Sequence, residues 1–103
     1  MDRGYFEVVM KEPFFRKMLS LPCAFGHRHM KKGQKFEKEA TVQTDRASWP
    51  VVIRGYDRFK FRNGWGEFVR ANELRVGDVC RFELIDEEEF IFKVCINPSL
   101  NEV

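Results

Sequence analysis

Three cations alternate with two aromatic residues in the segment 58–62, which reads R-F-K-F-R. Successive side chains of a β-strand point to opposite faces, so this pattern predicts a strand with Phe59 and Phe61 inward and the three cations outward. Like charges that share one face of a strand repel one another. A phosphate backbone would offset that repulsion, and acidic neighbours such as Asp57 would be the alternative. The segment therefore indicates either a polyanion-binding strand or an internally neutralised one.

The wider charge distribution favours a polyanion as well. Residues 11–62 contain thirteen of the 18 Lys and Arg but only five of the 16 Asp and Glu, although the whole chain has a net charge of only +2. A split of this kind predicts one face that attracts a polyanion and another that avoids it. The four consecutive acidic residues 86–89 should point away from the polyanion. A solvated surface with uneven charge is the plainer alternative.

Composition is typical of one small aromatic domain. The chain has 103 residues, of which 44% are hydrophobic, with eleven Phe and two Trp. This suits a single core filled by a few large side chains. The three cysteines lack metal or redox spacing, so we expect reduced thiols in an intracellular protein. No apolar run reaches the roughly 20 residues of a membrane helix and no signal peptide is visible, so we expect no membrane partner.

Alternating apolar residues predict most of the chain to be β-structure. Strands are predicted at 5–10, 35–44, 49–53, 58–62, 79–85 and 90–96, and the residues 54–57 are predicted to form a turn. Pro50 lacks a backbone donor, so its side of the strand should be an edge or a bulge. Together with two short helices, these strands predict a small, mostly antiparallel barrel with helices sealing its ends.

The two predicted helices lie on either side of the central strands. The first begins at Ser20-Leu21-Pro22, with Ser20 as its cap, and ends near Met30. The second starts at Asn63 or Gly64 and is stopped by the Gly77-Asp78 turn. Its apolar residues Trp65, Phe68 and Val69 follow i, i+3, i+4 spacing, which predicts a face buried in the core rather than a base-stacking platform.

Cys23, His27 and His29 are the residues that suggest a metal site or a catalytic pair. A metal needs converging ligands, and no fourth ligand occurs at a recognised spacing. Cys23 with His27 could mimic a thiol–imidazole pair, but no third group orients it. We therefore expect surface histidines beside a buried thiol, with no metal, no cofactor, no small-molecule substrate and no enzymatic activity.

The order of motifs resembles the plant B3 DNA-binding domain, and most closely its reproductive-meristem (REM) branch. The motifs are Leu21-Pro22 with Phe25 following, Ser48-Trp49-Pro50-Val51 on a strand, the run G-W-x-x-F-V-x-x-N-x-L-x-x-G-D over residues 64–78, and a Phe-rich pair of strands. The resemblance covers roughly residues 6–96. It implies that residues 1–103 form a single B3-like DNA-binding domain with a core at about 5–97.

The resemblance implies a mostly β fold, a seven-stranded open pseudobarrel with two short α-helices. It implies a nuclear transcription-factor domain of a plant that places two arms in the major groove of double-stranded DNA, with other transcription factors as further partners. The first arm maps to residues 11–19 and the second to residues 54–63. The first arm is short and its register against the family is open. The second carries Tyr56-Asp57, so base preference cannot be transferred and binding with weak sequence specificity is expected.

Cations and amides in the two arms are the predicted DNA contacts. Phosphates should be contacted by Arg16, Lys17, Arg58, Lys60 and Arg62. Base edges should be reached by Arg54, Arg58 or Asn63, because arginine and asparagine have bidentate geometry for guanine and adenine. The remaining predicted contacts are Lys11, Lys31, Lys32 and Tyr56. The rival interpretation is a protein-interaction β-barrel that binds an acidic partner through the same face, and the salt dependence of DNA binding separates the two.

Overall fold

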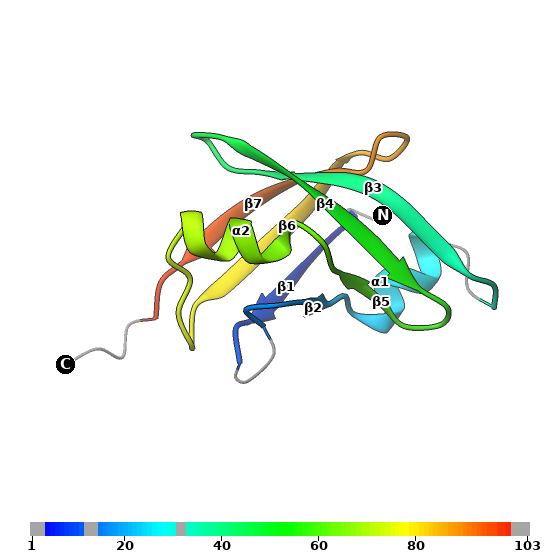
Figure 1. Ribbon diagram of the computed structural model, residues 1–103, viewed down its shortest axis with the longest axis horizontal. Coiled ribbons are helices and arrows are strands. Elements are labelled where there is room, and N and C mark those ends of the chain that lie inside the picture. The colour runs from blue at the N-terminus through cyan, green and yellow to red at the C-terminus, as the bar shows by residue number, and fades with distance from the viewer. Residues whose placement is uncertain (1–3, 12–14, 31–32, 100–103) are drawn as a thin grey trace.

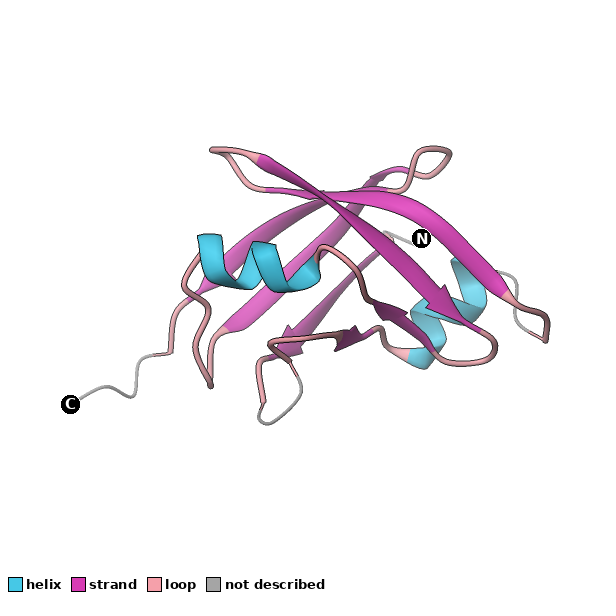
Figure 2. Ribbon diagram, viewed as in Figure 1, coloured by secondary structure: helices cyan, strands magenta, loops and turns pink. Residues whose placement is uncertain are grey.

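The computed structural model describes residues 4–11, 15–30 and 33–99. The strands in this part of the chain are β1 (Tyr5–Val9), β2 (Leu19–Ser20), β3 (Phe36–Gln43), β4 (Ser48–Gly55), β5 (Phe59–Phe61), β6 (Val79–Asp86) and β7 (Ile91–Asn97). The helices are α1 (Cys23–His29) and α2 (Trp65–Ala71) (Figures 1 and 2). No helix among these residues is long and apolar enough to cross a membrane.

All seven strands join one curled sheet in the order β1-β6-β7-β3-β4-β5-β2. Neighbouring strands are antiparallel, except that β3 and β7 run parallel at Thr41↔Ile91 to Gln43↔Lys93. The sheet does not close, because β1 and β2 are its two edges, and the two helices pack beside opposite ends of the curl (Figure 1). The expected seven-stranded open pseudobarrel with two short helices is confirmed.

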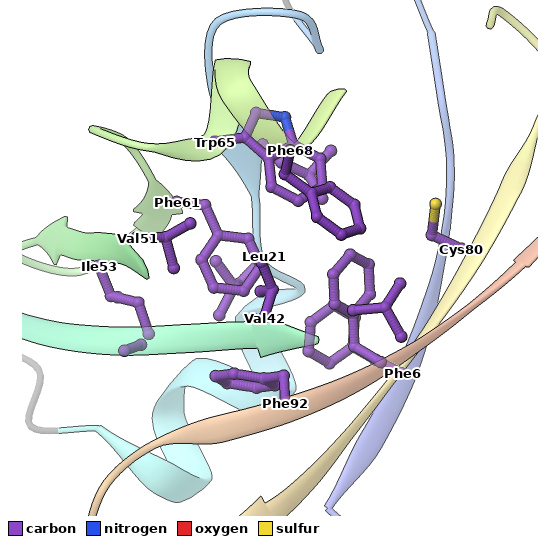
Figure 3. Packing of buried hydrophobic residues seen from close by; sticks show 14 of the residues in the cluster. Phe6, Leu21, Val42, Val51, Ile53, Phe61, Trp65, Phe68, Cys80 and Phe92 are labelled. Atoms are coloured by element: carbon purple, nitrogen blue, oxygen red, sulfur yellow. The ribbon is translucent and has the colours of Figure 1, made fainter. Parts of the chain in front are cut away.

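Aromatic rings fill the interior of the curl. Trp65 and Phe61 are fully buried and stack with ring centroids 5.5 Å apart at 17°. Phe68 continues the stack on the other side of Trp65, at 5.1 Å and 26° (Figure 3). Each such pair contributes about 0.5–1.5 kcal/mol beyond the burial of its area. The apolar face of α2 is therefore part of the core, as its spacing predicted.

The structure adds a strand that periodicity did not predict and moves the start of the first helix. Ser20 was expected to cap that helix, but it lies in β2, opposite Lys60 of β5. The next residue stays in extended pairing, because the Leu21 amide donates to the Phe59 carbonyl at 2.8 Å. Helix α1 therefore begins only at Cys23, after Pro22, and no side chain caps it.

Helix α2 also ends earlier than predicted. It stops at Ala71, several residues before Gly77-Asp78. The Asn72 side-chain amide donates to the Phe68 carbonyl at 2.9 Å, and the Leu74 amide donates to the Val69 carbonyl at 3.1 Å. These bonds use helix carbonyls that would otherwise lack a partner. The early turn lets Leu74 fold back into the core, where it is buried.

The missing donor of Pro50 faces a side of β4 that has no strand partner at this position. The Val52 amide donates to the Asn63 carbonyl and the Val52 carbonyl accepts from the Arg62 amide, so the backbone of Val52 faces β5. Pro50, two residues earlier, faces the same way but lies beyond the end of β5. Gly64, the N-cap of α2, fills that place with φ +96°, and a β-carbon there would overlap the Pro50 carbonyl oxygen.

We predict that Gly64→Ala destabilises the fold more than a glycine replacement that carries only the conformational cost. A non-glycine residue at positive φ costs roughly 1–2 kcal/mol, and at Gly64 the overlap with Pro50 adds to it. Gly33→Ala is the matched control, because Gly33 has φ +82° but no atom within 4 Å of its would-be β-carbon. Urea unfolding of both variants measures the difference, and equal losses would contradict the close approach.

Candidate nucleic-acid interface

The second predicted arm is the tight hairpin between β4 and β5. The tip is tied to the α1–β3 connection, because the Gly33 amide donates to the Tyr56 carbonyl and to the Asp57 carboxylate, both at 3.1 Å. Tyr56 is 57% exposed and Arg58 is also exposed. The Asp57 carboxylate therefore accepts a backbone hydrogen bond, and the tip presents an aromatic and a cationic side chain to solvent.

The alternation in the cationic strand is confirmed. Phe59 and Phe61 are 2% and 0% exposed, whereas Arg58, Lys60 and Arg62 lie on the outer side. Among the residues that the structure describes, no acidic side chain forms an ion pair with any of these three cations. Asp57 thus does not neutralise the strand by direct pairing, and no other described acidic side chain offsets the predicted repulsion by an ion pair.

Arg54 lies in β4 rather than in the turn that the sequence predicted. Its backbone is paired on both sides, opposite Glu37 of β3 and Lys60 of β5. Its Nε lies 3.4 Å from Glu37 Oε1, and both side chains are more than a third exposed. An exposed pair of this kind is worth only about 0.2–1 kcal/mol. A contact between Arg54 and DNA would therefore break a weak interaction.

The first predicted arm is anchored by its buried root. Phe15 is 3% exposed, and its carbonyl accepts a hydrogen bond of 2.6 Å from the buried indole Nε1 of Trp65. Arg16 covers the Phe15 ring, with its guanidinium carbon 4.6 Å from the centroid, and donates to the Leu74 carbonyl at 3.4 Å. Lys17 and Lys11 are exposed. Phe15 thus faces the core, whereas Arg16, Lys17 and Lys11 lie on the outside.

Pairing of β2 with β5 brings the two arms side by side. Ser20 stands opposite Lys60, so the end of the first arm lies against the cationic strand. A cleft of about 280 Å³ at the open edge between β1 and β2 is lined by Lys11, Ser20 and Lys60. A second hollow of about 440 Å³ is lined by cations and an amide of both arms. Met18 lines both, so they adjoin. We call the surface formed by Lys11, Arg16, Lys17, Arg58, Lys60, Arg62 and Asn63 the two-arm surface.

Two lining residues of the second hollow were missed by sequence reasoning. Glu67 and Arg70 of α2 face it, together with the backbone at Gly64 and Gly66. The signal was present in the spacing, since Gly66 and Arg70 are four residues apart and share a helix face. Lys31 and Lys32, which were also predicted to contact DNA, lie outside the described residues.

Of the cysteine and histidine side chains near α1, His27 is exposed as expected, whereas Cys23 and His29 differ from the expectation. Cys23 is exposed, not buried, and the His29 side chain is only 7% exposed. His29 turns inward because it shares a helix face with buried Phe25, with ring centroids 4.5 Å apart. Its Nδ1 lies 2.9 Å from Glu87 Oε2 at the β6–β7 connection. No group of three His, Cys, Asp or Glu among the described residues could hold a metal ion.

Comparisons with known proteins agree with this geometry. The family model of the B3 DNA binding domain matches residues 5–98. The chain is 34% identical over 93 residues to the B3 domain-containing transcription factor VRN1 of Arabidopsis thaliana, covering 87% of this chain and 26% of VRN1. It is 30% identical over 100 residues to B3 domain-containing protein REM17 of Arabidopsis thaliana, covering 96% of this chain and 10% of REM17. The chain thus spans about a quarter or less of these relatives.

Two solved structures share the fold. The Arabidopsis thaliana protein At1g16640.1 superposes with a TM-score of 0.77 at 19% identity, covering 93% of this chain and 91% of the other. The protein in the Arabidopsis FUS3-DNA complex superposes with a TM-score of 0.63 at 18% identity, covering 91% and 96%. The curled seven-stranded sheet with two helices is therefore a recurrent arrangement.

We predict that the buried thiol resists alkylation in the folded protein. Burial, with an added contribution from the negative charge of Asp78, raises the pKa of Cys80 to about 12, whereas Cys23 and Cys95 are exposed. Only the thiolate reacts. Mass spectrometry after iodoacetamide treatment at about pH 8.5 should find label on Cys23 and Cys95, and on Cys80 only after unfolding. Label on Cys80 without unfolding would contradict its burial.

We predict that Trp65→Phe loosens the first arm. The substitution leaves the buried Phe15 carbonyl without its donor, which costs about 1–3 kcal/mol, besides the packing of the lost ring. Urea unfolding should show the loss of stability, and the backbone amides of residues 15–17 should exchange with solvent faster.

Trp49→Phe is the matched control, because Trp49 is half-buried and packs edge-on against Phe68 at 5.0 Å. It should leave exchange at residues 15–17 unchanged. Equal acceleration of exchange by both variants would show that the indole hydrogen bond does not hold the arm.

Proposed function

Because the chain belongs to the B3 DNA-binding domain family, we propose that it binds double-stranded DNA through the two-arm surface, as the DNA-binding domain of a transcription factor. The observation that carries this proposal is the outer face of β5 and its flanks. Arg58, Lys60 and Arg62 gather there without an acidic partner among the described residues. A fold gains nothing from three adjacent unpaired cations, whereas a phosphate backbone neutralises them and releases counterions.

Phosphate contacts and base contacts divide between the strand and the arm tips. Lys60 is the central residue of β5, opposite Ser20 of β2, and Arg62 directly follows β5. This place between the two arms suits residues that set the position of the duplex by its phosphates. Arg58 and Tyr56 stand at the exposed tip of the second arm, and Asn63 is exposed where β5 ends. These are the residues that can enter the major groove, where arginine and asparagine recognise guanine and adenine.

Acidic residues mark the side that faces away from DNA. The run 86–89 lies at the β6–β7 connection, and this connection lies at the upper end of the molecule in Figure 1, whereas β2, β5 and the β4–β5 turn lie on the lower side. A duplex on the lower side therefore meets the cations and avoids the carboxylates.

The proposal extends to the setting in which such a domain works. Residues 5–97 would act as a single non-enzymatic DNA-binding domain in the nucleus, with double-stranded DNA as the first partner and other transcription factors as further ones. The name of one relative, the B3 domain-containing transcription factor VRN1, supports this setting. Weak sequence specificity is proposed as well, because the resemblance to the REM branch implies it and REM17 is among the relatives.

We predict that the triple variant Arg58→Gln/Lys60→Gln/Arg62→Gln loses salt-sensitive binding to a random-sequence duplex. Each lost phosphate contact reduces the magnitude of the slope of log K against log salt concentration by about 0.9, so loss of the Lys60 and Arg62 contacts reduces it by roughly 1.8. Fluorescence anisotropy across a salt series measures the slope, and circular dichroism checks that the fold is retained.

The matched control is Arg46→Gln/Arg81→Gln/Lys93→Gln. It makes the same change in net charge at exposed residues of the β3–β4 tip, β6 and β7, outside the two-arm surface. This control should keep nearly the wild-type slope. Failure of the wild-type protein to bind duplex DNA even at low salt would reject the proposal and favour an acidic protein partner for the same surface.

A further inference from the structure

A hollow between the first arm and α2 carries more positive charge than the two arms supply. Its volume is about 440 Å³, and its lining includes Arg16 and Lys17 from the first arm, Arg62 from the end of β5, and Arg70 from α2. One carboxylate, that of Glu67, faces the same space. Four cations thus surround the hollow against one acidic group, and the helix contributes one of each.

Three of the four cations in the hollow have no acidic partner within the described part of the chain. Among the described residues, no acidic side chain forms an ion pair with Lys17, Arg62 or Arg70, and Glu67 itself forms none. Arg16 is held by other contacts, over the Phe15 ring and against the Leu74 carbonyl. An unbalanced set of exposed guanidinium and ammonium groups around one hollow is a site for an anion.

Gly66 allows the first arm and Arg70 of α2 to lie close together beside the hollow. A β-carbon at this position would lie 3.3 Å from the Arg16 carbonyl oxygen and 3.6 Å from Arg70 Nη1. The Arg16 carbonyl and the Arg70 guanidinium therefore both approach the helix at Gly66, which has no side chain to separate them. The hydrogen bond from Trp65 to Phe15 holds the same part of the arm against the helix. The cations are thus placed by the fold before any ligand arrives.

We propose that this hollow binds a phosphate of the DNA backbone beside the two arms, with Arg70 of α2 as a contact residue. The inference rests on the proposed function, since the hollow shares Arg16, Lys17 and Arg62 with the two-arm surface. A duplex lying along that surface would carry its phosphates past the hollow. The planar fork of arginine can grip two phosphate oxygens at once. Helix α2 then has two faces, one in the core and one against DNA.

Glu67 provides a test in which the expected change in DNA affinity is opposite to that at Arg70. Its carboxylate would stand close to the bound phosphate and oppose it, while favouring the first turn of α2 in the free protein. Removal of the Glu67 charge should strengthen DNA binding, and removal of the Arg70 charge should weaken it. A role of these two residues in helix stability alone would not produce this pair of opposite effects on binding.

The experiment measures binding of the full chain to a random-sequence duplex over a salt series, for wild type, Arg70→Gln, Arg70→Lys, Glu67→Gln and Arg81→Gln. Arg70→Gln should reduce the magnitude of the slope of log K against log salt by about 0.9. This corresponds to about an 8-fold loss of affinity at 0.1 M salt if the lines converge at 1 M. Arg70→Lys should retain the slope, and Glu67→Gln should bind more tightly than wild type. Arg81→Gln, a matched charge change on the outer face of β6, should behave as wild type.

The outcomes separate this inference from the proposed function. Salt-sensitive binding by wild type with an unchanged slope in Arg70→Gln would overturn the inference and leave the two-arm surface standing. Equal losses in Arg70→Gln and Arg81→Gln would also overturn it, because they would reveal a general effect of net charge. No binding by wild type would reject both proposals.

Discussion

The hydrogen bond from the Trp65 indole to the Phe15 carbonyl is the interaction on which the arrangement of the interface depends. Trp65 is fully buried between Phe61 and Phe68, so its position is set by the packing of the core. The same side chain uses its single polar atom to hold the root of the first arm. The root of the first arm is thereby held against the buried core, and this contact fixes where the cations that follow Phe15 begin.

Charge on the outer face and burial on the inner face are coupled in β5. The strand is only three residues long, and repulsion among Arg58, Lys60 and Arg62 on its outer side opposes its formation. Two fully buried phenylalanines and the pairing with β4 and β2 hold it in place. The aromatic core thus stabilises a surface that is electrostatically unfavourable in the free protein. A DNA-binding strand with less burial behind it would need internal acidic partners, which would compete with phosphate.

The sequence predicted the parts of this fold that have a clear period and missed those that depend on distant partners. Alternation identified β5, β6 and β7, and the i, i+3, i+4 spacing identified the buried face of α2. Strand β2 has two residues and therefore no period; it exists because Leu19 and Ser20 meet Phe61 and Lys60. Arg70 was not among the predicted contacts. Its spacing from Gly66 places both on one helix face, but nothing in α2 itself indicates that the first arm packs against that face.

The same dependence on distant partners bears on the order in which the molecule can form. Strand β1 pairs with β6, β2 pairs with β5, and the Phe15 carbonyl accepts a hydrogen bond from Trp65. These N-terminal segments therefore contact residues that lie far along the sequence. Contacts of such large separation close slowly, because loop entropy must be lost before they form. On a ribosome, the basic first arm would emerge early and remain without its anchor until α2 and β6 had followed. The two-arm surface is thus a product of the last steps of folding, and a chain truncated before β6 would carry the cations without the geometry that aligns them.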